Sequence, residues 1–328
     1  MLAYLLRILY VFQLILGALL GSYAAVLSAQ HGGGALSLLL IPLSAIALPL
    51  LLQFLVILTS MIQSRTGGAA LLWWRILWAE YQSAVLIYML RQPWPRRRNG
   101  VRMPRANATG ETTHSAVPVV LVHGFICNHR LWDNMARALH RAGHPVLAVD
   151  LEPLFVSIDD YASLIDAAVI TLQKQTRSQQ IALVGHSMGG LAIRAWLRTL
   201  KPARLARVAR VITLGTPHQG TSIPQPVTTP NGVQMHWHSD WLQALQASEG
   251  SRLPPLMQIA LNLHDNICFP QPEQVLRDVP VTEFRGIGHL EMCLNPQVID
   301  WTCQQLADTP ATSGPSSELP SSQADEGR

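Results

Sequence analysis

Apolar residues dominate the N-terminal third of the chain in two long runs. The runs cover 2–27 and 35–62, and Arg7 is the one charged residue inside them. Each run exceeds the roughly 20 residues that a helix needs to cross a hydrocarbon core of about 30 Å. The short sequence SAQHGGGAL joins them. The pattern therefore predicts a helical transmembrane hairpin over residues 1–64, with a cleavable signal peptide ending near Ala29 as the alternative for the first run.

A third stretch, LLWWRILWAEYQSAVLIYML at 71–90, mixes polar and aromatic residues. At about 100° per residue, its polar and small positions share one wedge of a helix: Arg75, Ala79, Glu80, Gln82 and Ser83. Its Trp and Tyr rings favour the boundary between lipid and water. We therefore expect an amphipathic helix at the membrane surface within 65–94. A third membrane span is the alternative.

Basic residues are distributed unevenly around the two apolar runs. The loop between the runs contains no Lys or Arg, whereas Arg65, Arg75 and the segment RQPWPRRR follow the second run. The positive-inside rule then predicts that the N-terminus and everything after residue 62 lie on the cytoplasmic side of a bacterial inner membrane. The net charge is only +4. The arginines that cluster after the second apolar run favour a membrane-flanking role over nucleic-acid binding. We therefore expect no nucleic-acid partner.

The remainder of the chain alternates between short β-branched runs and segments with helical spacing. Residues 95–116 are rich in Pro, Arg and Thr and predict a linker, while 308–328 predict a disordered tail. Between them, 117–307 contains strand-like runs at 117–122, 144–150, 180–185 and 208–215, with helical patterns at 131–143, 159–175 and 188–200. This alternation predicts a mostly parallel sheet with helices on both faces. The continuous apolar runs fit strands that are buried on both sides.

The sequence ALVGHSMGGL at 182–191 places Ser187 between a predicted buried strand and a predicted helix. A G-x-S-x-G nucleophile elbow requires this context. Gly185 and Gly189 allow the tight turn around His186 and Ser187, and a helix N-terminus favours negative charge that develops beside the serine. An ordinary glycine-rich turn is the alternative. The strand-turn-helix setting favours the nucleophile.

Three segments together resemble the α/β-hydrolase superfamily, in its bacterial lipase and esterase branch. They are LVHGFICN at 121–128, GHSMGG at 185–190 and LGTPHQGT at 214–221. The resemblance covers 117–307 and implies an α/β-hydrolase fold with a small lid at about 220–254. It also implies that the backbone N–H groups of Phe125 and Met188 bind the oxyanion of the reaction.

The other two members of a catalytic triad are expected late in the chain, because hydrolases of this fold follow the order Ser, acid, His. His289 lies in the loop FRGIGHLEM, and Asp265 follows an apolar run, where the lipases of the resemblance often carry an Asp-Asn pair. A surface histidine without a catalytic role is the alternative for His289. The rival acids are Asp240, Asp278 and Glu283.

The four cysteines show no paired metal-ligand spacing. We expect no metal, nucleotide or redox cofactor. Cys268 and Cys293 flank the predicted acid and base loops, so a disulfide between them stays open. Such a bond would contradict a cytoplasmic location, because reducing compartments rarely keep disulfides.

Taken together, the sequence predicts a membrane-anchored serine hydrolase that cleaves carboxylic esters through Ser187, Asp265 and His289. Its expected partners are a lipid or acyl-ester substrate and the bilayer, and nothing in the sequence identifies a protein partner. A thioesterase or an acyltransferase would use the same triad, because fold and triad alone do not define a substrate. A membrane scaffold with an inactive hydrolase-like domain is the alternative from a different class.

Overall fold

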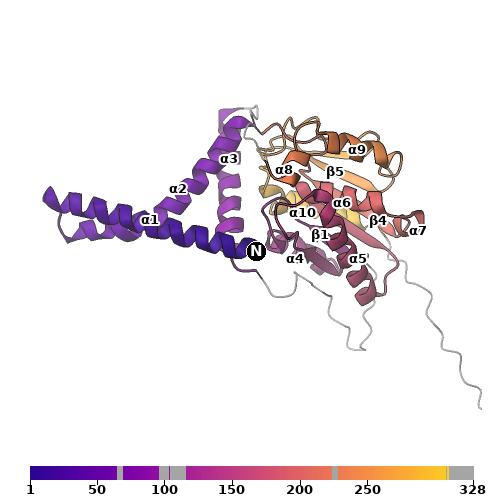
Figure 1. The fold of residues 1–328 in the computed structure, drawn as a ribbon, viewed down its shortest axis with the longest axis horizontal. Helices are drawn as coiled ribbons and strands as arrows, with labels where there is room; N and C mark the ends of the chain where they lie inside the picture. The colour runs from indigo at the N-terminus through magenta and orange to yellow at the C-terminus, as the bar shows by residue number, and fades with distance from the viewer. Residues whose placement is uncertain (65–68, 96–102, 104–115, 224–227, 308, 310–328) are drawn as a thin grey trace, which may run out of the picture.

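A computed structural model of the chain describes residues 1–64, 69–95, 103, 116–223, 228–307 and 309. A long helical hairpin projects from an α/β domain, and a single helix, α3, stands between the two (Figure 1). The predicted linker at 95–116 and the predicted tail at 308–328 lie almost entirely outside the described residues.

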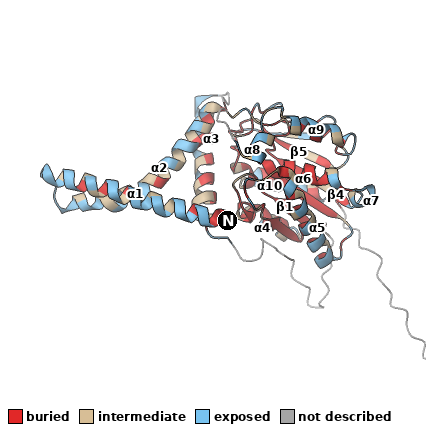
Figure 2. Cartoon of the chain, viewed as in Figure 1, coloured by how far each residue is buried: buried red, intermediate tan, exposed pale blue. Residues whose placement is uncertain are grey.

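The hairpin consists of α1 (Leu2–Gln30) and α2 (Leu40–Gln63), with the 3-10 turn η1 (Ala35–Leu39) before α2. By length and composition, two segments suffice to cross a membrane, Leu2–Gln30 and Ala35–Gln63. The helices pack closely at Gly17 and Gly21, where any side chain would collide with the backbone of α2. Small residues four apart permit such close packing of membrane helices. The outer surfaces of both helices are exposed (Figure 2).

Both ends of the hairpin lie against the α/β domain, whereas its loop points away (Figure 1). The ammonium group of Met1 pairs with Glu152 at 2.7 Å. Leu2 and Leu6 pack against Leu154 in a small apolar cluster. At the other end, the Ser60 hydroxyl of α2 accepts a hydrogen bond from the Asn266 side-chain amide at 2.8 Å.

Helix α3 (Ala70–Ala84) continues into the π-helical turn η2 (Val85–Arg91). Glu80 and Ser83, from the polar wedge of the sequence, are buried, whereas Trp74 and Trp78 are 58% and 56% exposed. Part of the polar wedge therefore faces the α/β domain, and the two indole rings face outward. The placement of this helix at a membrane surface stays a prediction.

Six parallel strands form one sheet in the order β2-β1-β3-β4-β5-β6. The strands are β1 (Val119–Val122), β2 (Val146–Val149), β3 (Ile181–His186), β4 (Val208–Leu214), β5 (Met257–Asn262) and β6 (Val281–Phe284). Strands β1, β2 and β3 are buried along their whole length, as continuous apolar runs predict. β6 lies at an edge and is mostly open to solvent.

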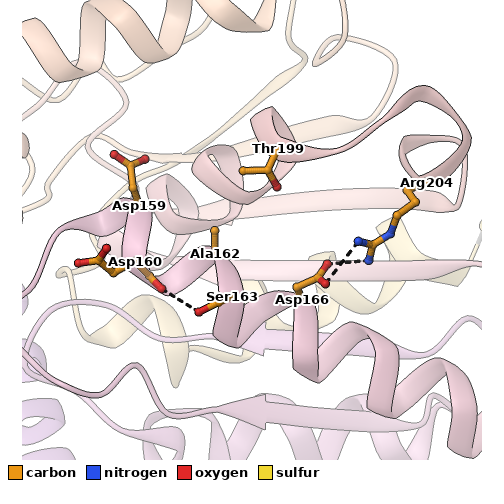
Figure 3. A pocket seen from close by; sticks show the side chains of 7 residues that line it. All are labelled: Asp159, Asp160, Ala162, Ser163, Asp166, Thr199 and Arg204. Carbon is orange, nitrogen blue, oxygen red and sulfur yellow. Dashed lines mark hydrogen bonds and ion pairs between the residues drawn. The ribbon is translucent and has the colours of Figure 1, made fainter.

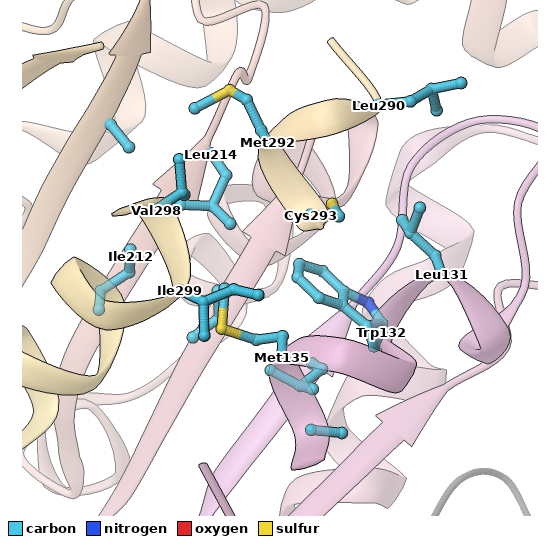
Figure 4. Close-up of a cluster of buried hydrophobic side chains, with 14 of the residues drawn as sticks. Leu131, Trp132, Met135, Ile212, Leu214, Leu290, Met292, Cys293, Val298 and Ile299 are labelled. Carbon is cyan, nitrogen blue, oxygen red and sulfur yellow. The ribbon is translucent and has the colours of Figure 1, made fainter. Parts of the chain in front are cut away.

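Alternate residues of β1 enter two separate cores, because successive strand side chains point to opposite faces. Val119 and Leu121 belong to one core, and Val120 and Val122 belong to the other. The first core also contains residues of α3, α4 (Asp133–Arg141) and α10 (Pro296–Ala307), some of which Figure 4 shows around Trp132 and Met135.

The second core contains residues of α5 (Ala162–Thr176), α6 (Met188–Thr199) and α9 (Asp240–Glu249). Helices thus cover both faces of a parallel sheet, and the predicted α/β-hydrolase fold is confirmed. The short elements of the domain are η3 (His129–Trp132), η4 (Ile158–Tyr161), α7 (Pro202–Leu205), α8 (Pro230–Gln234) and η5 (Glu291–Cys293).

The predicted lid region, 220–254, contains α8 and α9, and its residues 224–227 lie outside the described part of the chain. The Ser239 side chain caps α9 by accepting a hydrogen bond from the N–H of Leu242 at 3.2 Å. The Trp241 indole donates to Asp159 at 2.8 Å. The region is therefore bonded to η4 of the α/β domain. Its action as a lid stays a prediction.

Candidate active site

Ser187 lies at the sharp turn between β3 and α6. Its φ of 55° and ψ of −131° place a non-glycine residue in a region that costs energy to occupy. The turn is held by its N–H, which donates to the Leu214 carbonyl at 3.0 Å. Side chains at Gly185 and Gly189 would collide with the backbones of Gly190 and Val122. A strained serine conformation that the surrounding backbone holds in place is expected of a nucleophile elbow.

His289 and Asp265 form a buried pair beside this turn. The Nδ1 atom of His289 and Oδ2 of Asp265 are 2.8 Å apart, and both side chains are almost inaccessible to solvent. The other carboxylate oxygen, Oδ1, accepts the N–H groups of Ile267 at 2.8 Å and Cys268 at 2.7 Å. Asp265 is thus fixed by its own loop after β5, and it orients the imidazole of His289.

The loops of Ser187 and His289 are in direct contact. His186, the residue before Ser187, has its ring centroid 4.5 Å from that of His289. Its Nε2 and the His289 carbonyl oxygen are 3.0 Å apart, so the ring donates to the base loop. The Cys268 thiol interacts with both Ser187 and His289. The structure therefore brings the predicted nucleophile, acid and base into one site.

Charge at this site favours a protonated imidazole. Burial alone would lower the pKa of His289, but the adjacent Asp265 carboxylate and the Cys268 side chain together outweigh it and raise the pKa well above its usual value. By contrast, burial and the neighbouring His289 hold the pKa of His186 well below its usual value. His186 is thus a neutral hydrogen-bond donor, and His289 is the ring able to accept a proton.

The rival acids lie elsewhere on the surface. Asp240 is an exposed residue at the start of α9. Asp278 and Glu283 pair with Arg277 and Arg285, and these carboxylates are 76% and 51% exposed. Of the four acids considered, Asp265 is the one that contacts His289.

The turn after β1 lies directly against Ser187. A Cβ built on Gly124 would lie 2.8 Å from the Cβ of Ser187. The turn is held by His123, whose Nε2 accepts the Leu151 N–H at 2.9 Å and whose Nδ1 lies 2.8 Å from the Gly124 carbonyl oxygen. Phe125 follows in this turn. Met188 is the first residue of α6, where backbone N–H groups have no acceptor within the helix.

The sequence matches the alpha/beta hydrolase family over residues 119–317, which is more than half of the chain. The chain belongs to this family. A search of curated proteins finds no match.

Two solved structures show how far the resemblance extends. Lipase B of Aspergillus fumigatus is 17% identical with a TM-score of 0.54, over 67% of this chain and 58% of its own length. The mature lipase BlEst2 of Bacillus licheniformis is 15% identical with a TM-score of 0.53, over 63% of this chain and 96% of its own. At these identities the likeness shows a shared fold. The predicted resemblance to α/β-hydrolases is confirmed.

In this alpha/beta hydrolase, His218 of the third motif takes part in a buried network that does not include Ser187, Asp265 or His289. Arg194 of α6 forms two hydrogen bonds with Glu249, at 2.7 and 2.8 Å, and donates to the His218 carbonyl at 3.2 Å. His218 also contacts the Thr213 hydroxyl at 3.0 Å. The network joins the end of α9 to the nucleophile helix, which is a structural role.

All four cysteines of the hydrolase are free thiols, so Cys268 and Cys293 are not paired. Within the described ranges, one group of His, Cys and carboxylate side chains has ligand atoms near enough for a metal: Asp265, Cys268 and His289, within 4.8 Å of one another. Asp265 and His289 are already bonded to each other. We therefore interpret the group as an acid-base pair with a neighbouring thiol.

A separate open groove lies on the outer face of the helices (Figure 3). Its lining residues are Asp159, Asp160, Ala162, Ser163, Asp166, Thr199 and Arg204. Arg204 pairs with Asp166 there at 2.6 Å. Thr199 ends α6, twelve residues after Ser187, and a helix rises about 18 Å over that length. The groove is therefore remote from the triad.

Some groups around the base were not predicted. Asn266 accepts the His289 N–H at 3.0 Å, and Glu80 accepts the N–H of Leu290 at 2.8 Å across 210 residues of sequence. The Asp-Asn pair was a signal for Asn266, although the bond itself was not foreseen. Glu80 had no local signal, because helical periodicity shows that it lies on a polar wedge without showing what the wedge contacts.

Proposed function

We propose that this protein is a membrane-anchored serine hydrolase that cleaves carboxylic esters of lipid or acyl substrates. The observation that supports it most is the buried Asp265–His289 pair, 2.8 Å apart, beside a strained Ser187. A nucleophile, a base and a group that orients the base form a known arrangement for covalent catalysis.

In the proposed reaction, Ser187 Oγ attacks the ester carbonyl carbon while His289 takes the hydroxyl proton. The tetrahedral intermediate collapses, the C–O bond to the alcohol breaks, and His289 returns the proton to the leaving alcohol. Water then attacks the acyl-enzyme with His289 again as base, which releases the acid and restores Ser187. Asp265 fixes the tautomer of His289 and stabilises its imidazolium form.

The proposed oxyanion donors are the backbone N–H groups of Phe125 and Met188. The contact of Gly124 with Ser187, together with the position of Met188 at the first turn of α6, supports this assignment. Donors that are already oriented stabilise charge that develops on the former carbonyl oxygen, and each is worth about 3 kcal/mol.

We further propose that the hairpin anchors the enzyme in a bacterial inner membrane, with the catalytic domain in the cytoplasm. The exposed apolar surface of α1 and α2 supports a lipid environment, because such a large patch is unfavourable in water. Both hairpin ends contact the domain, through Met1 and Glu152 at one end and through Ser60 and Asn266 at the other, so a spanning hairpin would hold the active site at the bilayer surface. Arginines after α2 support the cytoplasmic side.

Ester turnover by the detergent-solubilised protein tests the proposal. We expect Ser187→Ala to lower kcat by about 10⁶-fold, as loss of a triad nucleophile does. Ser163→Ala, on the exposed surface, is the matched control and should keep wild-type turnover. Short p-nitrophenyl esters, long-chain glycerides and acyl thioesters should be compared. Turnover of thioesters alone would indicate a thioesterase, and a folded wild-type protein without any turnover would contradict the proposal.

A further inference from the structure

Glu80 of α3 is a completely buried carboxylate directly beneath the loop that carries His289. Its Oε1 accepts the Leu290 N–H at 2.8 Å, and its Oε2 accepts the Glu291 N–H at 3.0 Å. The fit against the loop is tight, because a side chain at Gly288 would collide with this carboxylate. The two residues that follow the proposed base are thus held by a helix from outside the sheet domain.

The same N-terminal segment also contacts the loop of the proposed acid. Ser60, near the end of α2, accepts a hydrogen bond from the Asn266 side-chain amide at 2.8 Å. The other atom of that amide, Oδ1, accepts the His289 N–H at 3.0 Å. Arg75 donates to the Gly286 carbonyl at 3.4 Å. Contacts from α2 and α3 therefore converge on both loops that form the acid-base pair.

Burial of Glu80 is energetically expensive. A buried carboxylate is strongly destabilising unless hydrogen bonds and charges compensate it. In the described part of the chain, no Lys or Arg forms an ion pair with Glu80. Burial raises its pKa to about 7, while the two backbone N–H groups and His289 oppose that rise. An apolar side chain at this position would pack α3 against the domain without the desolvation penalty of a carboxylate. The carboxylate therefore indicates a role for its hydrogen bonds to the His289 loop.

We propose that Glu80, assisted by Ser60, is a positioning residue that holds the His289 loop in its catalytic arrangement from the membrane-proximal segment. This inference rests on the proposed function. Glu80 acts through the backbone of Leu290 and Glu291, and its negative charge favours the imidazolium form of His289. The proposed site is then complete only while α3 is docked against this loop.

The charge of Glu80 is one of several that act on His289. The ionisable groups facing His289 are Asp265 and Cys268 from the loop after β5, His186 from β3, Cys127 from the turn after β1, and Glu80 from α3. Tyr88 and Cys293 also face Glu80. Among them, Asp265 acts most strongly on His289. Removing the Glu80 charge should therefore lower the pKa of His289 by less than removing Asp265 does.

The test compares Glu80→Gln with Glu283→Gln in the full-length protein. Glu283→Gln makes the same chemical change on exposed β6, which leads into the same loop. We expect Glu80→Gln to lower kcat roughly 10-fold to 100-fold, the effect of a small misplacement of a catalytic group. KM for a short soluble ester should stay within about twofold, since substrate contacts are unchanged. The acid limb of kcat/KM should move to lower pH, and Glu283→Gln should match wild type.

A folded Glu80→Gln protein with wild-type kcat and an unchanged acid limb would overturn the inference. If that variant does not fold, Ser60→Ala decides, because it removes the contact with Asn266 while leaving Glu80 in place. We expect it to lower kcat several-fold at constant KM, and wild-type kcat would overturn the inference. A wild-type enzyme without turnover would instead refute the proposed function, so the two failures are distinguishable.

Discussion

The hairpin and the α/β domain are both rich in apolar residues, but they place them in opposite ways. In the domain, apolar side chains fill two cores on the faces of the sheet. In the hairpin, most large apolar side chains of α1 and α2 remain exposed. Within the described residues, the domain therefore buries its own apolar surface, whereas most of the apolar surface of the hairpin stays uncovered. A bilayer is the surrounding that fits two helices of this length.

The two regions meet at the proposed active site, where each supplies a carboxylate that bonds to His289 or to its loop. Asp265 belongs to the domain and bonds to the ring of His289, whereas Glu80 belongs to the segment after the hairpin and bonds to the backbone that follows it. One carboxylate sets the chemistry of the imidazole and the other sets its location. Substitutions of the two carboxylates should therefore differ both in the property that they change and in the size of the effect.

Among these substitutions, we expect Asp265→Asn to have the largest effect on turnover and on its pH dependence. Removing the Asp265 charge leaves the effect of burial opposed mainly by the Cys268 side chain, so the pKa of His289 should fall. Because the pKa of His289 is raised, we expect the acid limb of kcat/KM above pH ~6.5 in the wild type, and this limb should move to lower pH in the variant. Turnover should fall by about 10⁴-fold, because the imidazole loses its correct tautomer. An acid limb that stays at its wild-type position would show that Asp265 does not control His289.

A smaller effect tests the hairpin by placing an arginine at an exposed apolar position in each of the two regions. Leu19 of α1 is 63% exposed, and Val281 of β6 is 40% exposed. Leu19→Arg should cost about 2.5 to 3.5 kcal/mol of membrane insertion, whereas Val281→Arg should be tolerated at an edge strand that already faces water. The membrane-bound fraction after alkaline carbonate extraction measures the difference. Equal membrane binding of both variants and the wild type would contradict a spanning hairpin.

The parts of this molecule that sequence predicted are those with local signals. The turn at Ser187 combines fixed glycine positions with a strand on one side and a helix on the other, so the local segment 182–191 predicts it. The sheet follows from alternating runs, because buried parallel strands and amphipathic helices have different periods. Asp265 was preferred to its rivals from its position after an apolar run, and it contacts His289.

The parts that escaped prediction depend on contacts between distant segments. The wedge containing Glu80 and Ser83 was expected on a helix at the membrane surface, and the structure packs both side chains towards the domain. Periodicity defines the wedge, but tertiary packing decides what it faces. The bond between His186 and the His289 carbonyl spans 103 residues. The spacing of residues within either motif does not predict this hydrogen bond.

The most direct test of the central claim is to treat the solubilised protein with a fluorophosphonate probe and to locate the adduct by mass spectrometry. The account predicts a single adduct on Ser187, absent in Ser187→Ala and strongly reduced in His289→Ala, with Ser163→Ala labelled like the wild type. An adduct elsewhere, or a folded protein that stays unlabelled, would contradict the assignment of Ser187 as an activated nucleophile.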